Sequence, residues 1–328
     1  MIYLFSFLPS ILCLITFWFL DNFSLVSFKR LILYFVLGVM SAICAYYINS
    51  FAYKLILNDK IFTGIFAPLS EEFLKTLIIL FSFRYNKIGF LTEAILLAFI
   101  AGIGFATFEN LWYIHNFTES NLFLWLIRGS GTALLHASST IVFSIIYFFT
   151  KEKKKGNYPL ALLSAIVIHS VFNLPFIPVM PKVLIQLVLL PVLVYGLFFL
   201  SEKKLNLWME KDFEKDFELL EMIKSGNFSN TKYGKYLATI SESFPPLVKV
   251  DIFCYAILYI ELSFYAKGLL LMKEVGLETK IQQNEIDKLN ELKELEKNIG
   301  KSAIRVLRPI LPDFNKKMWQ VFFLRDNL

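Results

Sequence analysis

Several ionisable and amide side chains interrupt the long apolar runs of this chain. They form four short groups: Glu71 and Glu72 with Lys75, Glu109 with Asn110, His136 alone, and His169 with Asn173. A charged side chain at bilayer depth costs about 2.5–3.5 kcal/mol on insertion scales, so such residues usually face a protein interior and mark a functional site. The candidate catalytic residues are therefore Glu71, Glu72, Glu109, His169 and Asn173.

Carboxylates and imidazoles around a wet cavity can activate water in two ways. Glu72, Glu109, His136 and His169 could hold a metal such as zinc, with one coordination position left for water. Alternatively, a buried glutamate could act as general base on a water while histidine and asparagine stabilise an oxyanion. Both arrangements suit peptide-bond hydrolysis, and the sequence leaves both open.

Structural and transport roles compete with hydrolysis. Glu71 or Glu72 could form an ion pair with Lys75 or Arg128, and His169 with Asn173 could provide hydrogen bonds between helices. An ion- or proton-coupled transporter would also bury such groups. Transporters commonly carry internal repeats, however, and this sequence shows none. Ser138, Ser139 and Thr140 look like ordinary small packing residues.

The composition indicates a membrane protein. Hydrophobic residues make up 56% of the 328 positions and charged residues 18%, against about 45–50% and 25% in soluble domains. A span needs roughly 20 mainly apolar residues, and helices satisfy their own backbone groups in lipid. We predict an all-α bundle of about seven spans: 2–20, 31–49, 61–83, 90–113, 122–149, 159–180 and 183–200.

Basic residues between the predicted spans alternate. Ten follow spans one, three, five and seven, and three lie in the other loops; the ten are Lys29, Arg30, Arg84, Lys87, Lys151, Lys153, Lys154, Lys155, Lys203 and Lys204. The positive-inside rule then predicts an outside N-terminus and a cytoplasmic C-terminus. The net charge of +6 is accounted for by this topology, so we expect contact with the lipid bilayer and no nucleic-acid partner.

Helical spacing predicts which candidates meet. Glu71 and Glu72 are adjacent, so one can face a cavity while the other takes a supporting role. His169 and Asn173 are four residues apart and share a helix face. At about 1.5 Å per residue, Glu71, Glu72 and His169 lie about 15–17 Å below the outer surface, His136 about 21 Å and Glu109 about 8 Å. Pro68 predicts a break within the third span.

The region from residue 201 onward differs from the rest because charged residues recur at short intervals. We predict a transmembrane catalytic bundle over 1–200 and a helical cytoplasmic region over 201–328. Residues 277–308 show the apolar spacing of an amphipathic helix or short coiled coil. Residues 247–272 indicate a buried or interfacial helix, and an eighth span remains an alternative. The sequence indicates no oligomeric state.

The four groups resemble the motifs of the PrsW family of intramembrane proteases. Residues 71–75 read EEFLK against the pattern EExxK, residues 105–110 read FATFEN against FxxxEN, His136 follows, and residues 169–173 read HSVFN against HxxxN. The resemblance covers roughly residues 60–180. Ser144 stands where the family often has glycine.

The resemblance implies a bacterial cytoplasmic-membrane enzyme, classed as a metalloprotease, that cleaves membrane proteins. An anti-sigma factor is the best-known substrate of that family. The resemblance also implies distant kinship with the type II CAAX prenyl endopeptidases, the ABI or CPBP group. Those enzymes carry histidine where this chain has Glu109, so their mechanism does not transfer unaltered.

Overall fold

The chain folds into two compact units, one up to residue 202 and one from residue 203 onward. A computed structural model describes residues 1–20, 26–56, 58–85, 87–117, 121–153, 157–173, 217–274, 277 and 281–307, with scattered residues between 178 and 203. Within these residues every regular element is a helix, so the all-α prediction is confirmed for them. Lys154, Lys155 and Lys204 lie outside the described residues.

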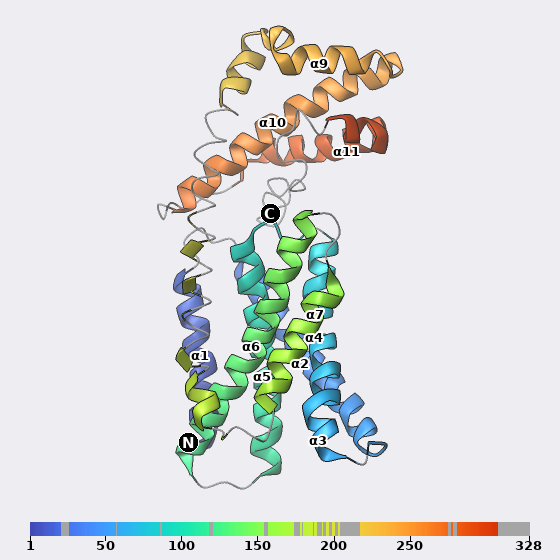
Figure 1. Ribbon diagram of the computed structural model, residues 1–328. Helices are drawn as coiled ribbons and strands as arrows, with labels where there is room; N and C mark the ends of the chain where they lie inside the picture. The colour runs from blue at the N-terminus through green and yellow to red at the C-terminus, as the bar shows by residue number, and fades with distance from the viewer. Residues whose placement is uncertain are drawn as a thin grey trace. The chain divides into compact units, whose positions relative to one another are not determined.

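The first unit is a bundle of roughly parallel and antiparallel helices (Figure 1). Its elements are α1 (Ile2–Leu20), α2 (Phe28–Tyr53), α3 (Asp59–Ile61), the π-helical segment η1 (Phe62–Phe66), α4 (Ala67–Arg84), α5 (Leu91–Asn116), α6 (Leu122–Lys153) and α7 (Tyr158–Asn173).

Three of the described helices are long and apolar enough to cross a membrane. They are Phe28–Tyr53, Leu91–Asn116 and Leu122–Lys151. Shorter apolar helices cover Ile2–Leu12 and Tyr158–Asn173. The predicted span 183–200 lies partly outside the described residues. The count of seven spans and the orientation of the termini therefore stay predictions.

Helix α5 forms the centre of the bundle, with buried side chains at nearly every position from Leu91 to Ala106. Two glycines let the neighbouring helices approach its backbone. A Cβ on Gly102 would lie 2.5 Å from the carbonyl oxygen of His136 in α6, and one on Gly104 would lie 2.2 Å from that of Phe35 in α2. Such close contact between small residues is typical of helix packing in membranes.

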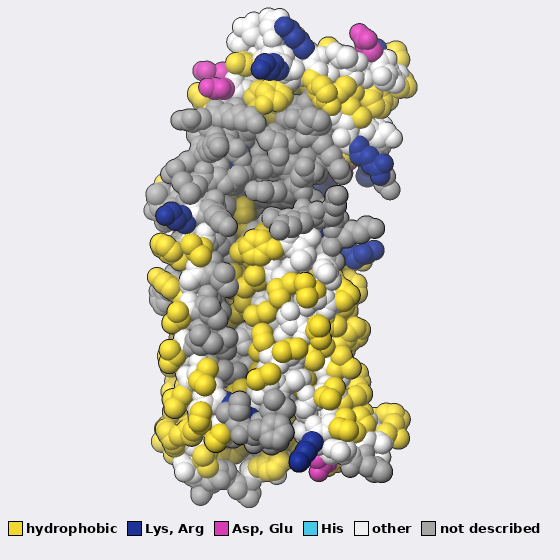
Figure 2. Space-filling view, viewed as in Figure 1, with side chains coloured by type: hydrophobic (Ala, Val, Ile, Leu, Met, Phe, Trp, Pro, Cys, Tyr) yellow, Lys and Arg dark blue, Asp and Glu magenta, His cyan; other side chains and the backbone are white. Residues whose placement is uncertain are grey.

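The outer surface of the bundle is apolar. On the visible face, hydrophobic side chains cover the bundle between its two ends (Figure 2). Leu163, Val167 and Val171 on α7 are each about half exposed, and their spacing of four residues places them on one stripe. Lipid chains would cover such a surface, which agrees with a membrane protein.

The helix break predicted at Pro68 is replaced in the structure by a wider helical turn before the proline. The chain remains helical from α3 through η1 into α4, and Pro68 is the second residue of α4. Within η1 the backbone widens, so that the amide of Ala67 donates to the carbonyl oxygen of Phe62, five residues earlier. A proline lacks an amide hydrogen and crowds the preceding turn, and this wider turn accommodates it.

The second unit contains the short 3-10 helix η2 (Phe228–Asn230), α9 (Lys232–Ser241), α10 (Pro246–Glu274) and α11 (Gln283–Leu307). The predicted amphipathic helix was expected from residue 277, but α11 begins at Gln283. Leu277 precedes it and is exposed. The Lys288 ammonium in α11 lies 3.1 Å from Glu261 in α10 and 3.2 Å from Glu285. Helix α10 is not among the candidate spans.

We expect Gly104→Ala to lower the stability of the protein in detergent by about 1–3 kcal/mol, because the new methyl group would overpack the contact between α5 and α2. Thermal unfolding followed by circular dichroism measures the change. The matched control is Gly268→Ala in α10, where a Cβ would meet no atom within 4 Å. Equal unfolding temperatures for the two variants would contradict the close-packing account.

Candidate active site

A cavity of about 640 Å³ lies within the first unit and is lined by residues of α2, η1, α4, α5, α6 and α7. Five of the predicted residues contribute to its lining: Glu71, Glu109, His136, His169 and Asn173. Glu72 does not line it. The four sequence groups span residues 71–173 of the chain and therefore come together at one place.

Glu72 is completely buried beside the cavity, and its Oε1 atom accepts three hydrogen bonds. The donors are Lys75 Nζ at 2.6 Å, Ser139 Oγ at 3.0 Å and His169 Nδ1 at 2.7 Å. Hydrogen bonds to an ionised group are stronger than those between neutral groups, and they compensate the loss of water around it. Our expectation that Ser139 only packs is wrong, because its hydroxyl bonds to this carboxylate.

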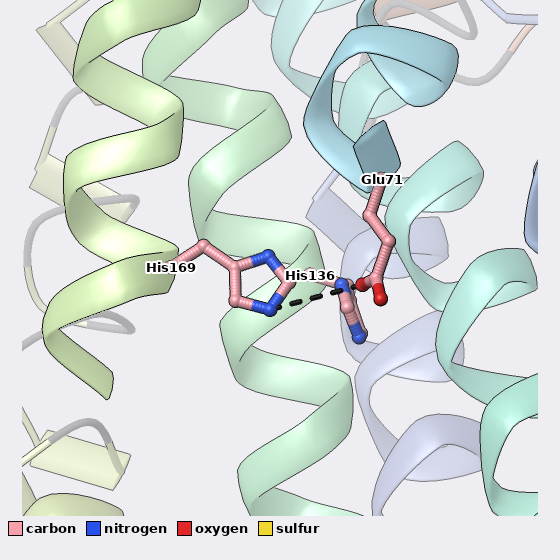
Figure 3. Close-up of side chains that lie close together, drawn as sticks. All are labelled: Glu71, His136 and His169. Carbon is pink, nitrogen blue, oxygen red and sulfur yellow. Dashed lines mark ion pairs between the residues drawn. The ribbon is translucent and has the colours of Figure 1, made fainter. Parts of the chain in front are cut away.

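His169 is fixed by Glu72 in one tautomer. An ionised carboxylate can only accept, so Nδ1 of His169 must carry the hydrogen, and the neutral ring then keeps its lone pair on Nε2. That nitrogen lies 3.8 Å from Glu71 Oε2. A dashed line marks this pair in Figure 3. A carboxylate that orients a histidine in this way is typical of metal-binding and general-base histidines.

His136 and Glu109 form a second hydrogen-bonded pair at the cavity. Nε2 of His136 lies 2.6 Å from Glu109 Oε2. Glu109 also accepts from the Arg128 guanidinium at 3.4 Å, and that guanidinium stacks 3.1 Å above the Tyr113 ring centroid. The helical rise had predicted different membrane depths for Glu109 and His136. Side-chain length and helix packing bring the two residues into contact.

Asn173 has a partner that the sequence did not indicate. Its Nδ2 donates to the carbonyl oxygen of Thr63 at 3.1 Å. With the five-residue spacing of η1, the natural donor to this carbonyl would be the amide of residue 68, which is a proline without a hydrogen. Asn173 therefore ties α7 to η1, and one of its two amide hydrogens remains for the cavity.

Asn49 is a residue of the site that the sequence reasoning missed. Its Nδ2 donates to Glu71 Oε1 at 3.0 Å, and its Oδ1 accepts from Ser70 Oγ at 2.5 Å. The signal was available, since Asn49 is an amide at the end of an otherwise apolar predicted span. Its contacts hold the carboxylate of Glu71 against α2.

Glu71, His136 and His169 each bring one potential ligand atom within 4.8 Å of the others (Figure 3). Two imidazoles and a carboxylate are a donor set that suits zinc, so the residues present fit a divalent metal by type and spacing. The sequence predicted Glu72 and Glu109 as the carboxylate ligands. The cluster in the structure contains Glu71 instead. In the structure those two carboxylates instead bond to the imidazoles.

The chain matches the pattern of a known protein family. The pattern of the PrsW family intramembrane metalloprotease matches residues 27–199, which is slightly more than half of the 328 residues. The match is wider than the 60–180 expected from the motifs, and it includes α2 with Asn49. Searches of curated proteins and of solved structures found no match.

Glu72→Ala should destabilise the protein by about 3–5 kcal/mol, because it leaves the buried Lys75 ammonium without its carboxylate. Glu71→Ala is the matched neighbour, and we expect it to cost less than about 1.5 kcal/mol, since Glu71 borders the cavity and loses one hydrogen bond. Thermal unfolding of both variants in the same detergent measures the difference. A larger loss for Glu71→Ala would contradict the division between a buried and a cavity-facing carboxylate.

Proposed function

Because the chain belongs to the PrsW family of intramembrane metalloproteases, we propose that the cavity of the first unit is its active site and hydrolyses a peptide bond in or near the bilayer. The chain is thus an intramembrane peptidase rather than a transporter. The assignment of the site rests on the pair formed by His169 Nε2 and Glu71, which both line the cavity. Glu72 bonds to the other ring nitrogen of His169, Nδ1.

The residues of the site divide into two sets in this proposal. Glu71, Glu109 and His169 line the cavity and touch the reacting water or peptide. Glu72 positions His169, and Asn173 positions η1 while offering its second amide hydrogen to a developing oxyanion. A carboxylate or imidazole that borders the cavity can take the proton of an attacking water and later deliver it to the leaving amine.

A metal fits the same cavity. Glu71 and His169, with His136 as the third member of the cluster, are the residues that would hold it. When bound, a metal would polarise the scissile carbonyl and lower the pKa of its water. Zinc is the metal that this donor set suits, and both routes use the same cavity-facing residues.

The proposal extends to the cellular setting. The substrate is a membrane protein, and a membrane-bound anti-sigma factor is the first class to test. The enzyme lies in a bacterial cytoplasmic membrane with about seven spans, an outside N-terminus and a cytoplasmic C-terminus. Residues 1–200 form the catalytic bundle and residues 201–328 a helical cytoplasmic region. Distant kinship with the CAAX prenyl endopeptidases is implied by the resemblance to the PrsW family and stays a proposal.

We expect His169→Gln to reduce cleavage by at least about 100-fold, because general acid–base groups typically contribute 10²–10⁴-fold. The assay uses purified protein in proteoliposomes with a panel of single-span membrane proteins that includes an anti-sigma factor, and mass spectrometry locates the cut. The matched control is His115→Gln, since His115 is exposed and does not line the cavity. Equal losses from both variants would remove the support for this site.

Chelation separates the two chemical routes. If a metal is required, we expect 1,10-phenanthroline to abolish cleavage and added Zn²⁺ to restore it. If glutamate alone activates water, cleavage persists in chelator, whereas Glu71→Gln still abolishes it. Cleavage by Glu71→Gln at the native rate, with chelator present, would contradict both routes as placed here.

A further inference from the structure

Arg128 is a cation at the cavity that the proposed chemistry leaves without a role. It belongs to α6, and 32% of its side chain is exposed. Among the described residues that line the cavity, it is the only lysine or arginine. Glu71 and Glu109 share the cavity with it, and each would repel an anion when ionised. A negatively charged group that enters the cavity is therefore attracted to one place.

Tyr113 in α5 holds the guanidinium of Arg128 in a fixed plane. The central carbon of the guanidinium lies 3.1 Å from the centroid of the Tyr113 ring. A guanidinium stacked on an aromatic ring gives the ring its face, while its N–H donors point outward in its own plane. A side chain that is ordered before a ligand arrives also loses less entropy when the ligand binds.

Glu109 uses little of the donor capacity of Arg128. A guanidinium has five N–H donors. Within the described part of the chain, its hydrogen bond runs from Nη2 to Glu109 Oε1 at 3.4 Å, whereas charge-assisted bonds are normally about 2.7–2.9 Å. The short bond of Glu109 goes instead to His136, whose Nε2 lies 2.6 Å from Oε2. Nε of Arg128 has no hydrogen-bond partner among the same residues.

We propose that Arg128, stacked on Tyr113, forms a subsite of the cavity that binds a carboxylate of the substrate. The inference rests on the proposed function, because it concerns the peptide that the same cavity cleaves. The planar guanidinium matches the two oxygens of a carboxylate and binds them through two parallel hydrogen bonds. A backbone carbonyl carries no net charge and offers one oxygen, so it gains less from this group.

The carboxylate subsite lies close to the proposed reacting groups. Glu109 contacts Arg128 with one oxygen and His136 with the other, so a single carboxylate separates the subsite from the histidines. Because an extended peptide advances about 3.3–3.6 Å per residue, the recognised carboxylate belongs about two residues from the bond that is cut. An aspartate or glutamate side chain supplies it at an internal site, and the C-terminal carboxylate supplies it at the end of a chain.

Peptide binding tests the inference without turnover. Three short apolar peptides with blocked N-termini serve as probes: one with an internal glutamate and an amidated end, one with glutamine in its place, and the glutamine peptide with a free C-terminal carboxylate. Fluorescence anisotropy of the labelled peptides gives dissociation constants for the full chain in detergent. The His169→Gln background keeps cleavage slow, and mass spectrometry confirms that the peptides stay intact.

We expect one or both carboxylate peptides to bind at least about fivefold more tightly than the neutral peptide. The peptide that binds more tightly identifies the source of the carboxylate. Arg128→Gln should remove this preference and change the affinity of the neutral peptide less than about twofold. An Arg128 with only a structural role would weaken all three peptides alike.

Two further variants keep the test decisive. Arg128→Lys retains a positive charge beside Glu109 and loses the planar fork, so it should show a smaller preference even if Arg128→Gln does not fold. The matched control is Arg84→Gln, since Arg84 is an exposed arginine of α4 that does not line the cavity. It should keep the preference in full.

Equal affinities of the three peptides before any change at Arg128 would overturn the inference. A preference that persists in Arg128→Gln, or is undiminished in Arg128→Lys, would do the same. Failure of the proposed function has a different signature, because His169→Gln would then leave cleavage unchanged while the carboxylate preference remained. If His169→Gln abolishes cleavage and the preference is absent, the carboxylate subsite alone is wrong.

Discussion

The site depends on one buried carboxylate. Glu72 has no contact with solvent, so its charge must be compensated by neighbouring donors in a medium of low dielectric constant, where an unpaired ion costs several kcal/mol. Lys75, Ser139 and His169 supply that compensation from α4, α6 and α7. The same three bonds fix where α6 and α7 stand against α4 and which nitrogen of His169 faces the cavity. The same three hydrogen bonds to Glu72 therefore stabilise the bundle and orient His169 for chemistry.

Packing around α5 is the second constraint, because it determines how closely the polar groups can approach. Gly102 allows the backbone of α6 to touch α5 at His136 itself, and Glu109 follows two helical turns later on the same helix. A larger side chain at residue 102 would separate the helices, and the short bond between Glu109 and His136 could not form at its 2.6 Å distance. Small residues in this bundle thus act on the site through the distance between helices.

Several of these features could be predicted from sequence and others could not. Long apolar runs identify the helices, and the cost of intramembrane charge identifies the residues of the site, because both effects are local and large. The sequence could not decide which of Glu71 and Glu72 faces the cavity, since adjacent residues differ only in the rotation of the helix. It also could not show that Asn173 pairs with Thr63, because that bond arises from the missing amide hydrogen of Pro68 in a distant segment. A depth count could not join Glu109 to His136, because it ignores side-chain length and helix tilt.

The carboxylates of the site differ in their cationic partners. Lys75 compensates Glu72, and Arg128 lies beside Glu109, so each of these carboxylates has a cation nearby. Among the described residues that line the cavity, Glu71 receives a neutral amide from Asn49 and a histidine nitrogen at 3.8 Å, but no lysine or arginine. When it is ionised, Glu71 is therefore the carboxylate of this cluster that lacks a lysine or arginine partner among the described residues. A divalent cation would neutralise that charge, and so would a proton taken from an attacking water. The two chemical routes therefore draw on the same electrostatic property, and the position of Glu71 serves either of them.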